Sequence, residues 1–214
     1  MNKIIVSIDG PSGSGKERIA QYISKKYSFF HLDSGILYRR VTSIIIKKKI
    51  EINNKKNLTN FLKNIKCLSS KKHKSLRKEN VSNQTSLIAK NPIIRNFINS
   101  QQRIIVKNML KNHAGCVIDG RDIGSKVFKN AKIKLFIHVK PKIRAERRHK
   151  QLIEQGEKSI YSRIFKDINL RDKADKNRKE SPLVVPKKAY VIDNSKSFKN
   201  TTSQINAIFK KVVK

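Results

Sequence analysis

Five short apolar runs, each rich in β-branched or aromatic residues, recur along the chain with the length of buried strands. They cover residues 4–8, 29–32, 116–118, 133–139 and 189–192. The stretches between them place apolar residues at helical spacing, most clearly over 92–109, 141–155 and 159–175, and a final helix closes the chain. Strands that alternate with helices predict an α/β fold with a parallel sheet.

Acidic residues end four of these runs, at Asp9, Asp33, Asp119 and Asp193. Open α/β sheets bind their ligands outside the carboxyl ends of the strands. The polar residues that follow each predicted strand are therefore the first candidates for a functional site.

A glycine-rich segment joins the first strand to the first helix and consists of Gly10, Pro11, Ser12, Gly13, Ser14, Gly15 and Lys16. Glycines let such a loop turn its backbone N–H groups around an anion, and the helix N-terminus adds its positive dipole end. Lys16 can reach the β- and γ-phosphates of a nucleotide as a compact charge. The strand, spacing, lysine and helix together favour a phosphate-binding loop over an ordinary Gly/Ser turn.

The two residues after this loop depart from the general motif, which has Ser or Thr directly after the lysine to bind Mg²⁺. Here Glu17 and Arg18 follow Lys16. A carboxylate so close to the phosphates should repel them, although Arg18 can offset its charge.

Length and charge add two constraints. The 214 residues suit one compact domain with a full core. Fifty Lys and Arg residues against fifteen Asp and Glu give a net charge of +35, which predicts attraction to polyanions. The lysines lie mostly in short scattered groups, however, and such groups are more typical of a solvated surface than of one binding face.

The cysteines and the apolar runs bear on the compartment. Cys67 and Cys116 lie far apart without metal-ligand spacing, so we expect two small buried residues in a reducing environment. The N-terminal residues lack the pattern of a signal peptide, and no apolar run is long enough to span a membrane. Both features predict a cytoplasmic protein.

Several motifs, taken in order, resemble those of bacterial cytidylate kinases over nearly the whole chain. The matching segments are the loop 10–16, Leu32-Asp33-Ser34-Gly35 with Tyr38-Arg39, Ser86 with Pro92-Ile93-Ile94-Arg95, Asp119-Gly120-Arg121-Asp122-Ile123-Gly124, and Arg171-Asp172 with Asp175 and Asn177-Arg178 ahead of Ser181-Pro182-Leu183. One such motif alone is a weak signal, whereas five in the family's order are a strong one.

The resemblance implies the P-loop nucleoside monophosphate kinase fold, an α/β fold with a five-stranded parallel sheet flanked by helices. It implies a core of residues 1–39, 92–144 and 161–214, a nucleoside-monophosphate-binding insert at 40–91 and a lid at 145–160. The insert has weak helical periodicity and is short around 66–80, so we expect the family's small β-structure to be reduced or missing there.

The resemblance also implies that the γ-phosphoryl group of ATP is transferred to CMP or dCMP, with UMP a poorer acceptor. Mg²⁺ would accompany ATP without a metal ligand from protein side chains, and a monomer is expected. The implied catalytic residues are Lys16, Arg121 and Arg171. ATP is expected at Gly10, Pro11, Ser12, Gly13, Ser14, Gly15, Lys16, Glu17 and Arg18. CMP is expected at Ser34, Tyr38, Arg39, Ser86, Arg95, Gly120, Arg121, Asp122, Arg171, Asp175 and Arg178.

Arginine suits the acceptor phosphate, which the resemblance assigns to Arg39, Arg121 and Arg171, because its planar fork can hold two phosphate oxygens. The alternative for each is a surface ion pair. Asp175 and Arg178 are implied to meet the pentose and the base. With Arg171 they fall on one helix face, where intrahelical salt bridges are the alternative.

The resemblance assigns the cytosine edge to Ser86, Arg95 and Asp122. The Asp122 carboxylate would accept the exocyclic amino donor that distinguishes cytosine from uracil, although capping is an alternative for Ser86 and Asp122. Closure of the expected lid would bring Arg147 and Arg148, with Arg144, onto the transferring phosphate, and a solvated helix face is the alternative.

Two other functions stay open at this point. The net charge favours a nucleic-acid-binding protein on the same scaffold, although the chain lacks basic stripes interleaved with aromatics. The Glu17-Arg18 pair favours a degenerate kinase that binds nucleotide but turns over slowly. On that hypothesis, Glu17→Gly combined with Arg18→Thr raises kcat.

Overall fold

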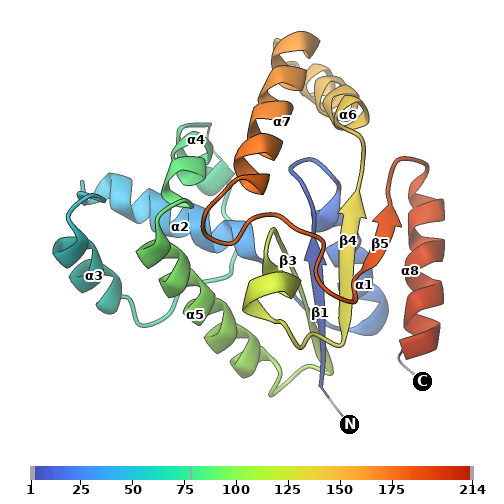
Figure 1. The fold of residues 1–214 in the computed structure, drawn as a ribbon, viewed down its shortest axis with the longest axis horizontal. Helices are drawn as coiled ribbons and strands as arrows, with labels where there is room; N and C mark the ends of the chain where they lie inside the picture. Colours follow the sequence, from blue (N-terminus) through green and yellow to red (C-terminus); the bar gives the residue numbers. More distant parts are fainter. Residues whose placement is uncertain (1–2, 78, 213–214) are drawn as a thin grey trace.

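A computed structural model describes residues 3–77 and 79–212 of the chain. The strands in this part of the chain are β1 (Ile4–Asp9), β2 (Phe30–Asp33), β3 (Gly115–Gly120), β4 (Ile133–His138) and β5 (Tyr190–Asp193). They form one parallel sheet in the order β2-β3-β1-β4-β5 (Figure 1). The parallel sheet and each of its predicted strands are therefore confirmed.

Helices cover both faces of this sheet. They include α1 (Lys16–Tyr27), α2 (Ser34–Lys47), α5 (Pro92–Met109) and α8 (Phe198–Val212). Side chains alternate along β3 and so separate two cores: Cys116 and Ile118 pack with α2 and α5, whereas Val117 packs with α1 and α8. The result is a sheet buried on both faces, which explains why its strands have continuous apolar runs.

Two further helices, α6 (Pro141–Glu154) and α7 (Tyr161–Lys176), stand beyond the carboxyl end of β4 in Figure 1. Their bounds agree with the helices predicted from apolar spacing. The chain breaks between them at Gly156, whose φ of 74° lies in the left-handed region that favours glycine. The two helices therefore lie at the carboxyl-terminal end of the sheet, where Asp9 and Asp33 end their strands.

The described part of the expected insert is helical. It contains α3 (Lys55–Lys63), the short 3-10 turn η1 (Lys74–Arg77) and α4 (Glu79–Ile88). Asn54 and Asn91 begin α3 and α5, because each side-chain oxygen accepts a hydrogen bond from the first turn of its helix. Residues 40–77 and 79–91 hold no strand, in agreement with the expected loss of β-structure.

The two cysteines differ in exposure. Cys116 is buried in β3, where burial raises the pKa of its thiol to about 12. Cys67 is exposed, so the prediction of two buried cysteines is wrong for this residue. The next residue takes the buried position instead: Leu68 is 3% exposed, and its N–H donates to Gln101 Oε1 at 2.8 Å.

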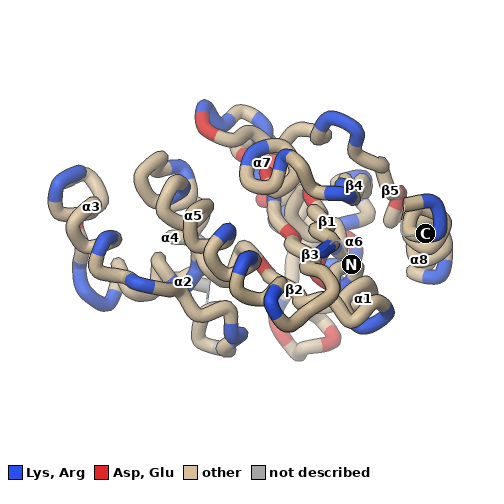
Figure 2. The backbone as a smooth tube through the Cα atoms, turned by 90° about the horizontal axis from the view of Figure 1, so that it is seen from below, with Lys and Arg blue, Asp and Glu red and all other residues tan. Residues whose placement is uncertain are grey.

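Basic residues are spread widely over the molecule. Figure 2 shows Lys and Arg on α1, α3, α5 and α8, which lie in different parts of the structure. This distribution agrees with the interpretation of the scattered lysine groups as solvated surface. In the ranges 3–77 and 79–212, helices long and apolar enough to cross a bilayer are absent.

Candidate functional site

The glycine-rich segment turns between β1, the central strand, and α1. Gly13 and Gly15 have φ values of 72° and 84°, in the left-handed region where a side chain is disfavoured. Left-handed residues that alternate with ordinary ones direct successive N–H groups toward one point and form an anion-binding concavity. The loop therefore has the conformation that the motif predicts.

Lys16 begins α1 and is 6% exposed. Its Nζ donates to the Pro11 carbonyl at 2.7 Å and to Ser14 Oγ at 3.4 Å. Burial, followed by the nearby Arg121 guanidinium, lowers the pKa of Lys16 to about 7, although Asp119 and Asp9 oppose the shift. The ammonium is thus held over the loop, in an environment that an anion would stabilise.

Asp9, the last residue of β1, binds the turn that follows β3 and so keeps it beside the start of the loop. Both of its carboxylate oxygens accept backbone hydrogen bonds at 2.7 Å, one from Ile123 and one from Gly124. These residues open the π-helical turn η2 (Ile123–Val127) that follows β3. Burial raises the pKa of Asp9 to about 6, against the lowering effect of these two hydrogen bonds. The sequence pattern predicts Asp9 only as the end of a strand.

Four separate elements bring polar side chains together beside this loop. The group, called the polar cluster below, consists of Tyr38 from α2, Arg95 from α5, Arg121 and Asp122 from the turn after β3, Asp175 from α7, and Arg178 just beyond it. All of these were predicted as site residues. These residues lie close enough to influence one another electrostatically. Burial is the chief cause that raises the pKa of the Tyr38 hydroxyl, and the charges of Arg95, Asp122 and Arg178 also affect that pKa.

Ion pairs organise the polar cluster. Arg95 Nη2 donates to Asp122 Oδ2 at 2.6 Å, with side chains 3% and 5% exposed, and the Arg95 guanidinium lies 5.5 Å from the Tyr38 ring centroid. Asp175 Oδ2 accepts a hydrogen bond from Arg121 Nε at 2.8 Å, and Asp175 Oδ1 pairs with Arg178 Nη1 at 3.5 Å. Asp175 therefore joins α7 to the turn after β3, in addition to the local pair with Arg178.

Several buried atoms of the polar cluster have no hydrogen-bond partner within the described residues. They are Tyr38 Oη, Arg95 Nε, and Arg178 Nε and Nη2. Buried polar atoms are nearly always hydrogen-bonded, so unpartnered donors gathered in one place indicate a site shaped for a polar ligand.

Arg39 and Arg171 are less constrained. Arg39 lies close enough to Asp33 to oppose the rise in that carboxyl's pKa, which burial and then Asp119 produce. Arg171 is exposed on α7. Neither arginine forms a hydrogen bond or ion pair with another residue in the ranges that the structure describes. Arg39, Arg121 and Arg171 were predicted to converge on the acceptor phosphate. Among the described residues, only Arg121 of these three is held by an ion pair, which it forms with Asp175.

Two predicted serines differ in environment. Ser34 is buried at the start of α2, and its Oγ lies so close to Gly120 that a Cβ there would approach within 2.6 Å. Gly120 is thus required by packing against Ser34. Ser86 is exposed on α4.

Glu17 and Arg18 turn to different partners. Glu17 Oε1 lies 2.6 Å from Nζ of Lys72, which precedes η1, and it also accepts a hydrogen bond from Gln21 Nε2 at 3.4 Å. The Arg18 guanidinium lies 4.0 Å from the ring centroid of Phe198, at the start of α8. Lys72 therefore offsets the charge of Glu17 in this structure, through a contact that no motif in the sequence predicts.

The three arginines expected to act at lid closure differ in their burial and in their hydrogen-bond partners. Arg144 is 2% exposed and bonded to Asp172 and to the Ser12 carbonyl, so in this structure it is held in the interior beside the phosphate loop. Arg147 donates to the carbonyls of Asn194, Ser195 and Lys196, beside the end of β5. Arg148 is exposed and bonds Gln151 on its own helix, as the solvated-face alternative predicts.

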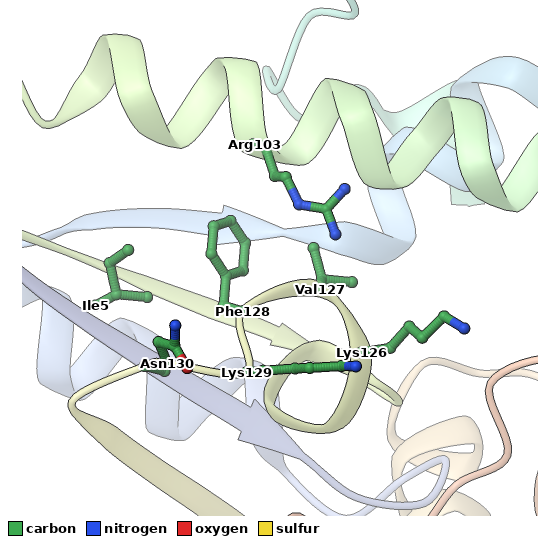
Figure 3. A pocket seen from close by; sticks show the side chains of 8 residues that line it. Ile5, Arg103, Lys126, Val127, Phe128, Lys129 and Asn130 are labelled. Atoms are coloured by element: carbon green, nitrogen blue, oxygen red, sulfur yellow. The ribbon is translucent and has the colours of Figure 1, made fainter.

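A separate hollow of about 430 Å³ lies away from this site (Figure 3). It is lined by Ile5, Arg103, Lys126, Val127, Phe128, Lys129, Asn130 and Ala131, between α5 and the residues that connect η2 to β4. None of these residues belongs to the matched motifs, so the hollow is not part of the candidate site.

The fold and the loop define the class of protein. A parallel α/β sheet whose central strand leads into an anion-binding loop, with a lysine at the start of the next helix, is typical of P-loop kinases. The crystal structure of TT1252 from Thermus thermophilus shares this fold, with a TM-score of 0.56, 13% sequence identity and coverage of 99% of both chains.

The comparisons of sequence are more specific. The family model for cytidylate kinase matches residues 6–213. A cytidylate kinase of Fusobacterium nucleatum is 35% identical over 230 residues, covering 100% of this chain and 99% of that protein. A cytidylate kinase of Rickettsia akari is 37% identical over 190 residues, covering 89% of this chain and 84% of that protein. The chain belongs to the cytidylate kinase family.

Proposed function

We propose that the protein transfers the γ-phosphoryl group of ATP to CMP or dCMP and releases ADP with CDP or dCDP. The observation that carries this proposal is the placement of an anion-binding loop beside a polar cluster in which several buried donors lack partners among the described residues. Family membership supports the same reaction. Phosphoryl transfer needs in-line positioning and charge neutralisation rather than a protein nucleophile, and these groups supply both.

On the donor side, residues 10–18 hold the ATP phosphates. Their backbone N–H groups surround the phosphate oxygens, and Lys16 leaves the Pro11 carbonyl to reach the β- and γ-phosphates. This exchange lets a negatively charged ligand replace a neutral acceptor of the ammonium, so the electrostatic gain is made only when ATP is bound.

The residues fit a Mg²⁺ ion that arrives with ATP. Asp33 and Asp119 face each other at the ends of β2 and β3, and their proximity contributes to the raised pKa of Asp33. These two carboxylates depart from the expectation that protein side chains supply no metal ligand: their oxygens are suitable for Mg²⁺, and a cation there would relieve this repulsion. A Mg²⁺ ion held there would neutralise the charge that develops on the transferring phosphate. Among the described residues no group of three His, Cys, Asp or Glu side chains forms a protein cage for a metal.

On the acceptor side, Arg39, Arg121 and Arg171 hold the phosphate of CMP. Asp175 and Arg178 meet the pentose and base, and Ser34, Tyr38 and Gly120 complete the walls of the site. The contact between Arg121 and Asp175 supports this arrangement, because it preorients one phosphate-binding guanidinium before the nucleotide arrives.

Cytosine selection is assigned to Arg95, Asp122 and Ser86. Arg95 occupies Asp122 Oδ2, while Asp122 Oδ1 accepts no hydrogen bond from the described residues. That oxygen can accept the exocyclic amino group of cytosine, whereas uracil presents a carbonyl oxygen that the carboxylate repels. CMP and dCMP are therefore better acceptors than UMP.

The proposed division of the chain follows from these roles. Residues 1–39, 92–144 and 161–214 form the core, 40–91 the insert that covers the acceptor nucleotide, and 145–160 a short lid. The Glu17–Lys72 pair supports the assignment of the insert, because it brings residues 40–91 to the start of α1.

A nucleotide panel tests the proposed function. A coupled assay of ADP release with CMP, dCMP, UMP and AMP as acceptors should give the highest kcat/KM with CMP and dCMP. Activity on AMP alone would leave a P-loop kinase but remove the cytidylate assignment. Absence of activity on every acceptor, with ATP still bound, would favour the degenerate kinase.

The +35 charge motivates a secondary property rather than a second function. Charge spread over several helices supports weak nucleic-acid binding that fades as salt rises, measurable by fluorescence anisotropy with a labelled single-stranded RNA.

The remaining part of the proposal is that the protein is a monomer in the cytoplasm. The two free cysteines fit such a reducing compartment.

A further inference from the structure

Three carbonyl groups of the phosphate loop are held by side chains. Lys16 Nζ bonds the Pro11 carbonyl, Asn194 Nδ2 bonds the Ser14 carbonyl at 2.8 Å, and Arg144 Nη1 bonds the Ser12 carbonyl at 2.9 Å. Lys16 belongs to the loop motif itself. The other two side chains come from more than 130 residues later in the sequence.

Arg144 is the more completely engaged of these two. Its side chain is 1% exposed, its Nε donates to the Val139 carbonyl at 3.0 Å, and its Nη1 and Nη2 both pair with the Asp172 carboxylate. Such a bidentate arginine–carboxylate pair fixes the plane of the guanidinium. Because these bonds use its donors within the protein, Arg144 is a fixed part of the core and not a group that closes onto the transferring phosphate.

The bond to Ser12 determines which way the loop amides point. A trans peptide is planar, so its N–H points opposite to its C=O. None of the described residues is in a cis peptide. When Arg144 draws the Ser12 carbonyl toward α6, the N–H of Gly13 points in the opposite direction within the same peptide plane. That N–H has no acceptor within residues 3–77 and 79–212.

We propose that Arg144, fixed by Asp172, is a positioning residue for ATP: it orients the Ser12–Gly13 peptide so that the Gly13 N–H donates to a phosphate oxygen. This inference deepens the proposed function and rests on it for the identity of the donor nucleotide. The contact with Gly13 supports it, since a Cβ there would lie 3.7 Å from Arg144 Cβ, in van der Waals contact.

The same pair links the two halves of the site. Asp172 lies on α7 next to Arg171 and one turn before Asp175, which pairs with Arg121. Arg144 therefore ties the loop that receives ATP to the helix that faces the acceptor. Loss of the pair should loosen the donor loop first, because the bond to Ser12 is direct, whereas Asp175 keeps its own partners.

The test compares Arg144→Lys and Asp172→Asn with matched controls on α7. Lysine keeps the charge but lacks the planar fork, and asparagine keeps the shape but loses the charge. Arg163→Lys and Asp167→Asn make the same chemical changes at exposed positions. ATP affinity is measured by titration calorimetry in the absence of CMP, kinetic constants by ADP release, and Tm by thermal unfolding.

We expect Arg144→Lys to raise the Kd and KM for ATP by about tenfold to 100-fold, as small misplacements at a site do, with the KM for CMP nearly unchanged. Asp172→Asn should give a smaller effect of the same kind, and the controls none. A lower Tm with unchanged ATP affinity in the folded variant would make the role purely structural and overturn the proposal. If Arg144→Lys does not fold, Asp172→Asn decides by the same criterion.

Failure of the proposed function is distinguishable from failure of this inference. A wild-type protein that binds ATP without phosphorylating CMP would contradict the function, while the calorimetric effect of Arg144→Lys would still stand. Equal increases in KM for ATP and CMP would contradict the inference alone.

Discussion

The donor loop and the polar cluster lie side by side but are built in opposite ways. The loop is one contiguous segment, residues 10–16, whose backbone is proposed to bind phosphate; its Pro11, Ser12 and Ser14 carbonyls already accept side-chain hydrogen bonds. The polar cluster is assembled from α2, α5, the turn after β3, and α7, and it retains buried donors without partners in the described residues. A backbone site can be complete in itself, whereas a side-chain site needs its ligand to satisfy it.

The difference also separates affinity from selectivity. Backbone N–H groups and one ammonium recognise phosphate, which every nucleoside triphosphate carries. The buried Arg95–Asp122 pair presents a fixed pattern of donors and acceptors, which under the proposed function would match the cytosine edge and leave other bases unpaired. Changes on the donor side should therefore alter ATP parameters, and changes in the polar cluster should alter the choice of acceptor.

The largest effect is expected from Lys16→Ala. Loss of the ammonium removes electrostatic stabilisation of the transferring phosphate and should lower kcat by about 10³-fold, the order found for preorganised charges. Steady-state ADP release measures it. Lys25→Ala, an exposed lysine on the same helix, is the control and should retain the wild-type rate. A Lys16→Ala enzyme with normal turnover would contradict the assignment of the phosphate loop.

Asp122→Asn should act on the other side of the comparison. The amide can donate to the uracil carbonyl, so the ratio of kcat/KM for CMP over UMP should fall by about 10-fold to 100-fold, the value of a charged hydrogen bond. The KM for ATP should change little. The ratio is measured on one folded sample, so a lower Tm from the unpaired Arg95 does not affect it. An unchanged ratio would show that Asp122 does not read the base.

The lowered pKa of Lys16 predicts proton uptake on the donor side. With a pKa of about 7 in the nucleotide-free protein, Lys16 is mostly neutral at pH 8, and the ATP phosphates must raise that pKa to bind the ammonium form. ATP binding at pH 8 should therefore take up close to one proton. Affinity should fall about tenfold per pH unit above 7, while the bound form stays protonated.

Calorimetric titrations of ATP at pH 8, in two buffers of different ionisation enthalpy, measure this uptake. Lys16→Met is the control and should show none. If the wild type also binds ATP without proton uptake, the ammonium is already charged and its buried position does not lower its pKa.

The smallest effects concern the contact between Lys72 and Glu17, the residue that follows the loop. Lys72→Ala removes the counter-charge 2.6 Å from Glu17 and should raise the KM for ATP up to about fivefold at low salt, less at high salt, as expected for a partly exposed ion pair. Lys71→Ala is the neighbouring control. A KM unaffected by Lys72→Ala at low salt would mean that Glu17 is too well solvated to repel the phosphates.

The double variant Glu17→Gly with Arg18→Thr separates compensation from degeneracy. Because Lys72 already neutralises Glu17, we expect kcat to change by less than about threefold, within the range of a surface ion pair. A much larger increase in kcat would support the degenerate-kinase hypothesis instead.

Much of the fold and part of the site could be predicted from local pattern. The five strands, the long helices and the loop 10–16 each depend on residues close together in the sequence. The spacing of apolar residues and of glycines is therefore enough to predict them. The members of the polar cluster came from motif resemblance. The bonds of Asp9 to η2, of Arg144 to Ser12 and of Lys72 to Glu17 join residues far apart in the sequence, and no local pattern records them.

The sequence by itself determined the sheet, its buried strands and a loop able to bind phosphate, because hydrophobic burial and glycine conformation act over a few residues. Only the tertiary structure decided which arginines are fixed and which are available. A guanidinium has the same charge everywhere along the chain, and its role depends on whether folding brings it to a carboxylate, as for Arg144, or leaves it exposed, as for Arg171.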